Sequence, residues 1–120
     1  MKVRAIRGAT QLSEDDSAQM AEAVTELLKE LFEKNDLDKE DLISILFTST
    51  GDLRSDFPAA AARTLDLGDI PLICALEIPV AGSLPRVVRV MVHAHSERYH
   101  AEIKHIYKRG AEVLRRDIAQ

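Results

Sequence analysis

The chain has 120 residues, and its 20 acidic and 16 basic residues give a formal net charge of −4. A length of this order fits one hydrophobic core, so we expect residues 1–120 to form a single domain. A nucleic-acid partner requires a clustered basic face, which this charge balance disfavours. No apolar run approaches a membrane span of about 18 residues, so we expect no membrane partner either.

Cysteine usage and the first residues indicate where the protein acts. Cys74 is the only cysteine, so no intrachain disulfide is possible. The opening residues Met1-Lys2-Val3-Arg4 are not followed by a long apolar segment, and we do not expect a secretory signal. These features together predict a reduced, cytoplasmic location.

The N-terminal part of the chain predicts a strand followed by a long amphipathic helix. The segment 3–10 is typical of a strand that ends at Gly8. Ser13 is the expected N-cap of the helix, with two aspartates favourably placed in its first turn. Apolar residues then recur at three- and four-residue spacing: Met20, Val24, Leu27, Leu28, Leu31 and Phe32. Asn35 is the expected end of this helix, whose apolar stripe should pack on the core.

Three further strands and a short helix are expected in the middle of the chain. Residues 42–47 predict a largely buried strand. Pro58 is typical of the first turn of a short helix that continues to Arg63. Residues 72–77 and 87–94 predict two more strands, separated by a loop with proline and glycine. This order of elements indicates an α+β or mixed α/β fold.

The segment 99–114 fits two interpretations. Apolar residues in its first half recur at helical spacing, so periodicity alone favours a helix there. Residues 105–107 and 112–114 also permit strands. His100 and His105 are expected at the surface.

Four charged residues stand in or beside segments that predict strands: Arg7, Glu77, Arg89 and Arg115. Small domains rarely place charge in their strands without a use for it. Arginine pairs with anionic groups, and a carboxylate accepts a hydrogen bond from a hydroxyl. The set therefore indicates a pocket for a small anionic ligand that also carries a hydroxyl group.

Short segments along essentially the whole chain resemble one family, in order and with nearly the same spacing. The family is the monofunctional, trimeric α/β-barrel class of bacterial chorismate mutase, which is distinct from the all-helical class. The matching segments are Arg4-Ala-Ile-Arg7-Gly-Ala-Thr10, Thr50-Gly-Asp-Leu53, Asp56-Phe57-Pro58-Ala59, Pro71-Leu-Ile-Cys74-Ala-Leu-Glu77, Val88-Arg89-Val90-Met91, His105-Ile-Tyr107 and Val113-Leu-Arg115. Each segment alone is weak evidence, but their order together is specific.

The resemblance implies an isomerase that converts chorismate to prephenate, an intramolecular Claisen rearrangement in aromatic amino-acid biosynthesis. It implies an α+β subunit whose mixed β-sheet carries a long and a short helix on one face. Three subunits would form a pseudo-α/β barrel with active sites at their interfaces. The ambiguous segment would contain a strand around Tyr107 to Leu114. Chorismate and prephenate are the expected small-molecule partners, with no cofactor and no metal ion.

Four residues take catalytic roles by this resemblance. Arg89 would donate to the ether oxygen while its bond to carbon breaks, because a guanidinium stays charged and rigid. Arg7 would pair with a substrate carboxylate, with the Tyr107 hydroxyl as a further donor. Glu77 would accept a hydrogen bond from the ring hydroxyl, and its charge would favour the electron-poor ring.

Further substrate-binding residues follow from the same resemblance. Cys74 would lie at the Glu77 end of the site. Four residues would line or close its mouth: Phe57, Arg63, Leu114 and Arg115. Because strand side chains alternate, Cys74 and Glu77 should point to opposite sides. Either the strand bulges near Leu76, or one residue acts through its backbone or from a neighbouring subunit. The family often has lysine where this chain has Ala60, so one positive charge at the entrance is missing.

Other functions remain open from the residues alone. A non-catalytic trimeric small-molecule-binding protein of similar fold is one, and a purely structural assembly module is another. The set of strand arginines, carboxylate and tyrosine favours the enzyme. His93 and His95 share one strand face, but no carboxylate or cysteine completes a metal site with them. Cys74 has no identifiable activating base, so we expect a packed cysteine rather than a nucleophile.

Overall fold

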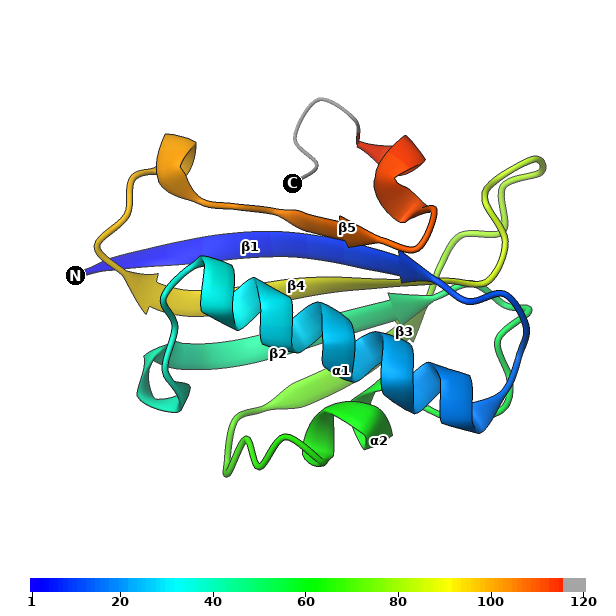
Figure 1. Ribbon diagram of the computed structural model, residues 1–120, viewed down its shortest axis with the longest axis horizontal. Coiled ribbons are helices and arrows are strands. Elements are labelled where there is room, and N and C mark those ends of the chain that lie inside the picture. The colour runs from blue at the N-terminus through cyan, green and yellow to red at the C-terminus, as the bar shows by residue number, and fades with distance from the viewer. Residues whose placement is uncertain (116–120) are drawn as a thin grey trace.

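Five strands form one mixed β-sheet in the computed structural model, which describes residues 1–115 (Figure 1). The strands are β1 (Lys2–Gln11), β2 (Leu42–Ser49), β3 (Leu72–Leu76), β4 (Val87–Ser96) and β5 (Ile106–Lys108). They lie in the order β3-β2-β4-β1-β5. Strand β4 runs antiparallel to both of its neighbours, whereas the outer pairs β2–β3 and β1–β5 are parallel.

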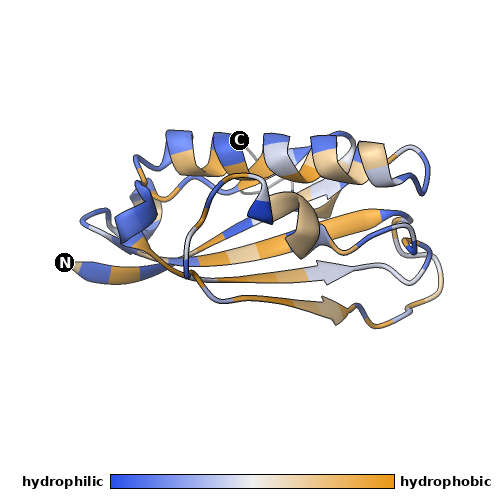
Figure 2. Ribbon diagram, turned by 90° about the horizontal axis from the view of Figure 1, so that it is seen from below, coloured by the Kyte–Doolittle hydropathy of each residue, from blue (hydrophilic) through white to orange (hydrophobic). Residues whose placement is uncertain are grey.

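Both α-helices, α1 (Ser17–Lys34) and α2 (Pro58–Arg63), lie on the same side of the sheet (Figure 2). Val88, Val90 and Val92 of β4 are buried, whereas Arg89 and Met91, which alternate with them, are less covered. The predicted α+β fold, with a long and a short helix on one face of a mixed sheet, is therefore confirmed. Within residues 1–115, neither helix combines the length and the apolar character that crossing a membrane requires.

Helix α1 begins later than the sequence predicted. Its N-cap is Asp16, whose carboxylate accepts a hydrogen bond from the Gln19 backbone N–H at 3.0 Å. The predicted cap, Ser13, lies in the preceding loop, where its hydroxyl donates to the Gln19 side chain instead. The end at Asn35 is confirmed, and its side-chain amide donates to the carbonyls of Leu31 and Lys104.

The sequence predicted that the first strand ends at Gly8, but β1 continues to Gln11. Gly8 pairs with Val90 of β4 on one side and with Ile106 of β5 on the other. A Cβ atom at this position would lie 3.0 Å from the Ile106 carbonyl oxygen and 3.1 Å from Leu27 of α1. The missing side chain therefore allows the helix to approach the middle of the sheet.

The segment 99–114 is neither a helix nor a long strand, so both predictions for it are wrong in part. Its first half contains only a short 3₁₀-helix, His100–Glu102. The strand is confined to β5, because Arg109 and Gly110 follow it with φ of 55° and 96°. Two successive residues in the left-handed region turn the chain out of the sheet. A second 3₁₀-helix, Ala111–Leu114, takes the place of the predicted strand end.

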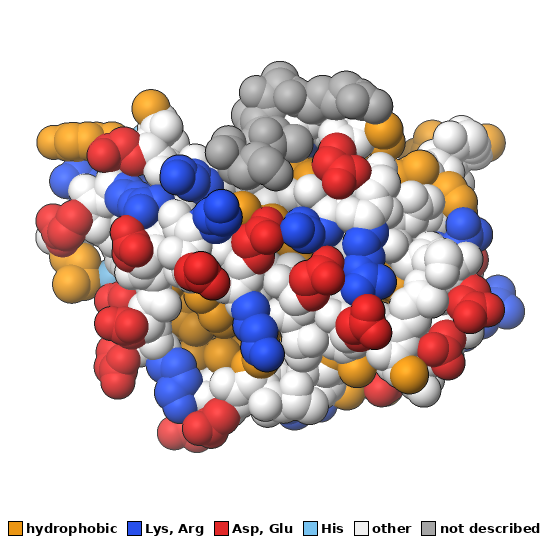
Figure 3. Space-filling view, viewed as in Figure 1, with side chains coloured by type: hydrophobic (Ala, Val, Ile, Leu, Met, Phe, Trp, Pro, Cys, Tyr) orange, Lys and Arg blue, Asp and Glu red, His pale blue; other side chains and the backbone are white. Residues whose placement is uncertain are grey.

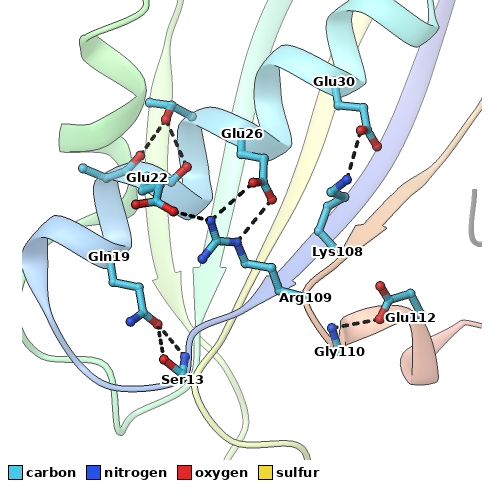
Figure 4. A network of polar contacts seen from close by, with 11 residues as sticks. Ser13, Gln19, Glu22, Glu26, Glu30, Lys108, Arg109, Gly110 and Glu112 are labelled. Atoms are coloured by element: carbon cyan, nitrogen blue, oxygen red, sulfur yellow. Dashed lines mark hydrogen bonds and ion pairs between the residues drawn. The ribbon is translucent and has the colours of Figure 1, made fainter.

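Ion pairs fasten this C-terminal segment to α1. Basic and acidic side chains are interspersed over the helix-bearing face (Figure 3). Arg109 lies 2.8 Å from Glu22 and 3.2 Å from Glu26, and Lys108 lies 3.0 Å from Glu30 (Figure 4). The three glutamates recur every fourth residue, so they follow one face of the helix. The hydrogen bond from Arg109 lowers the pKa of Glu26.

Candidate active site

Two rows of paired residues cross the side of the sheet that faces away from the helices. The first row runs from β3 to β1 through Ile73, Leu46, Met91 and Arg7. The second row runs from β3 to β5 through Ala75, Thr48, Arg89, Ala9 and Tyr107. Residues paired directly across strands point to the same side of a sheet. Backbone pairing therefore brings both strand arginines to one surface.

A hollow of about 200 Å³ opens over these two rows. Its lining comes from four strands and the C-terminal segment: Arg7, Gly8, Leu46, Thr48, Arg89, Val90, Met91, Tyr107 and Arg115. Four of the predicted site residues, Arg7, Arg89, Tyr107 and Arg115, thus meet in one place. The hollow combines guanidinium groups and a phenol with an apolar floor, which suits a small anion with an apolar body.

Glu77 joins this hollow through Arg89. Its Oε2 lies 3.1 Å from Arg89 Nε and accepts a hydrogen bond of 2.7 Å from the Thr48 hydroxyl. The Glu77 side chain is 16% exposed, whereas that of Arg89 is 45% exposed. The Glu77 backbone N–H donates to the Ser49 carbonyl at 3.0 Å. The carboxylate is therefore held between β2 and β4, at the edge of the hollow.

A histidine side chain binds the backbone of Arg7. The Arg7 backbone N–H donates to Nδ1 of His105 at 2.9 Å, which requires this ring nitrogen to be unprotonated. Burial lowers the pKa of His105 below its ordinary value, and the charges of Arg7 and Arg115 lower it further. Each of these effects favours the neutral ring that the hydrogen bond needs.

Tyr107 forms a nearly buried wall of the hollow. Only 4% of the residue is exposed, and it packs in a small cluster with Ala9, Val87 and Ala111. Leu114 lies partly buried against this cluster. Leu114 therefore supports the wall next to Tyr107, and the 3₁₀-helix that carries it leads directly to Arg115.

Three predicted site residues lie elsewhere in the subunit. Phe57 and Cys74 line a second hollow, of about 360 Å³, between β3 and the start of α2. Arg63 is exposed at the end of α2 and lines neither of these two hollows. Strand β3 ends at Leu76, so Glu77 has left the strand, while Cys74 packs against the core. Within one chain, Cys74 thus lines the second hollow, whereas Glu77 pairs with Arg89.

Among the polar residues of the site, sequence reasoning missed Thr48 and His105. Thr48 lies one position beyond the predicted strand 42–47, but it is a residue of β2 that lines the hollow and donates a hydrogen bond to Glu77. His105 was expected at the surface, yet it is half-buried and binds the Arg7 backbone. Residues 45–47 are all apolar, so no alternation in the sequence marked Thr48 as a residue of the site.

Comparisons with known proteins agree on one family. The sequence model of chorismate mutase type I matches residues 3–118. The chorismate mutase AroH of Thermus thermophilus is 42% identical over 117 residues, covering 97% of this chain and 96% of that protein. AroH of Bacillus subtilis is 33% identical over 120 residues, covering 99% and 94%. The solved structure of a chorismate mutase from Clostridium thermocellum superposes with a TM-score of 0.89 at 44% identity, covering 92% and 98%. The chain therefore belongs to the chorismate mutase type I family.

Proposed function

We infer that this protein is a chorismate mutase, an isomerase that converts chorismate to prephenate in aromatic amino-acid biosynthesis. Family membership over the whole length supports this activity. The observation that carries the mechanism is the Arg89 guanidinium, which lines a hollow and is held there by Glu77. We propose that the enzyme acts in the cytoplasm, where its pathway makes aromatic amino acids.

The reaction sets modest chemical demands. One carbon–oxygen bond of the enolpyruvyl ether breaks while one carbon–carbon bond to the ring forms, without a nucleophile or a proton transfer. The enzyme can lower the barrier by holding the side chain over the ring in the reactive diaxial conformation. It can also place fixed charge where the transition state becomes polar. Strand residues suit both tasks, because the sheet holds their backbones rigidly.

Arg89 stabilises the negative charge that gathers on the ether oxygen. Its Nε faces Glu77, and within residues 1–115 its terminal nitrogens make no hydrogen bond. Those nitrogens are thus available to the substrate. A guanidinium does not lose its proton, and the ion pair with Glu77 orients it before the substrate binds. The donor therefore needs no reorganisation as the bond breaks.

Arg7 and Tyr107 bind a carboxylate of chorismate. Arg7 lies next to Met91 in the first row, and Tyr107 ends the second row at β5. Arg115, which lines the same hollow, adds positive charge that attracts the dianionic substrate. Glu77 accepts a hydrogen bond from the ring hydroxyl, and its negative charge stabilises the electron-poor ring.

The complete active site forms between subunits of a homotrimer. Phe57 and Cys74 line a hollow separate from that of Arg89 within one chain, which supports a site completed by a neighbouring copy. The helix-free side of the sheet also carries exposed apolar residues, among them Ile73, which is 64% exposed. Burial of this side in a trimer would enclose the substrate with Phe57, Cys74 and Arg63 of the adjacent subunit.

A direct assay tests the proposed activity. Purified protein is mixed with chorismate, the loss of chorismate absorbance is followed, and prephenate is identified among the products. Conversion at catalytic protein concentrations supports the enzyme. Binding of chorismate without any conversion would instead favour a non-catalytic small-molecule-binding protein. The absence of both would leave an assembly role and overturn the proposal.

A further inference from the structure

Thr48 occupies the position on β2 that links Arg89 with the end of β3. It pairs directly with Arg89 of β4 on one side and with Ala75 of β3 on the other. Glu77 follows β3, and its backbone N–H is tied to Ser49, the residue after Thr48. The Thr48 side chain points into the hollow that Arg89 lines. A side chain at this position can act on both charged groups.

The hydroxyl of Thr48 and the guanidinium of Arg89 bind the same oxygen of Glu77. Thr48 Oγ1 donates to Oε2 at 2.7 Å, and Arg89 Nε lies 3.1 Å from that atom. In the part of the chain that the structure describes, both contacts of this carboxylate are made by Oε2. The hydrogen bond from Thr48 and the ion pair with Arg89 thus hold Oε2 and leave Oε1 as the acceptor for a ligand.

We propose that Thr48 is a positioning residue of the active site. This inference rests on the proposed function, because it assigns Oε1 of Glu77 to the ring hydroxyl of chorismate. Glu77 lies beyond the last residue of its strand, and its side chain has three torsions that must be held. Without the Thr48 hydroxyl, the carboxylate turns, and the guanidinium paired with it turns as well. Thr48 acts through Glu77 and Arg89 and does not itself react.

Thr48→Val and Thr48→Ser form a matched pair for the test. Valine keeps the β-branched shape that suits a strand but removes the hydroxyl, whereas serine keeps the hydroxyl and loses the methyl group. We expect Thr48→Val to lower kcat by about tenfold or more, with KM changed by less than about threefold. Thr48→Ser should retain most of the activity. The thermal unfolding temperature of each variant separates this effect from a loss of folded protein.

A double-mutant cycle identifies the group through which Thr48 acts. In a Glu77→Gln background, adding Thr48→Val should cost much less than it does alone, since the carboxylate it positions is gone. Full additivity of the two losses, or a Thr48→Val variant with normal kcat, would overturn the inference. Failure of the wild-type protein to convert chorismate would overturn the proposed function instead. Normal conversion with a damaging Glu77→Gln and a harmless Thr48→Val would reject only the role of Thr48.

Discussion

Arg89 and Val90 are neighbours in β4 with opposite surroundings. The Arg89 side chain is 45% exposed and paired with Glu77, whereas Val90 is buried under the helices. The alternation of a strand thus supplies a charged group to the hollow without burying it in the core. The ion pair is partly open to solvent, so its value lies in orienting the guanidinium more than in stabilising the fold.

Replacement of Arg89 tests its role in the transition state. Loss of one preorganised donor at a developing negative charge typically costs about 100- to 1000-fold in kcat. We expect this loss for Arg89→Ala, with a much smaller rise in KM, measured by steady-state kinetics on chorismate. Arg89→Lys keeps the charge but loses the planar group, so its loss should be intermediate. A nearly normal kcat in Arg89→Ala would contradict the assigned role.

His105 should make the stability of the protein depend on pH. Its pKa in the folded chain lies below the ordinary value of about 6.5, so the unfolded chain binds a proton first as the pH falls. Stability from this group is therefore complete above pH 6.5 or so and decreases below it. Urea unfolding of wild type and His105→Asn between about pH 7.5 and pH 5.5 measures this dependence. Asparagine keeps an acceptor for Arg7 but does not titrate, so the variant should show a smaller loss; equal losses would exclude His105 as the cause.

The packing of α1 on the sheet depends on Gly8. A methyl group there would lie 3.0 Å from a backbone oxygen of β5, which cannot rotate away. Gly8→Ala should therefore lower the free energy of unfolding by about 1–3 kcal/mol in urea titrations. Gly51→Ala is the matched control, because its Cβ would meet only Leu76, at 3.7 Å. Equal stability of both variants would show that the helix does not need this close approach.

The elements that the sequence predicted well are those governed by local patterns. The apolar spacing from Met20 to Phe32 defines α1, and Pro58 correctly marks the start of α2. The C-terminal segment was not predictable in this way, since its course depends on the left-handed turn at Arg109 and Gly110. Ion pairs with α1 hold that turn (Figure 4). These partners are far away in the sequence and leave no periodic signal.

The residues of the site also divide into those that a local pattern reveals and those that depend on distant partners. Arg7 and Arg89 could be singled out because a charge within an apolar strand is unusual in any sequence. Thr48 and His105 could not, because a threonine in a strand and a histidine in a polar segment are ordinary. Their importance arises from strand register, which brings Thr48 to Glu77 across 29 positions and His105 to Arg7 across 98.

At the scale of the whole molecule, the helix-free side of the sheet predicts assembly. Light scattering during size-exclusion chromatography should give a mass near three times the 13.4 kDa of one chain. Ile73→Glu places a charge on this side and should reduce both the mass and the activity. Ala18→Glu adds the same charge on the exposed start of α1 and should affect neither. An active species with the mass of a single chain would contradict the shared site.

Alternate residues of β4 point to the hollow and to the helices. A change in the length of the strand therefore alters both sides of the sheet at once. Deleting one residue before Arg89 would turn the arginine toward the helices and a valine toward the substrate. We therefore expect this strand to tolerate replacements, and insertions or deletions to be tolerated only in connections such as the one from Ile78 to Arg86. A redesign of the hollow should therefore replace residues of β4 and leave the strand at its present length.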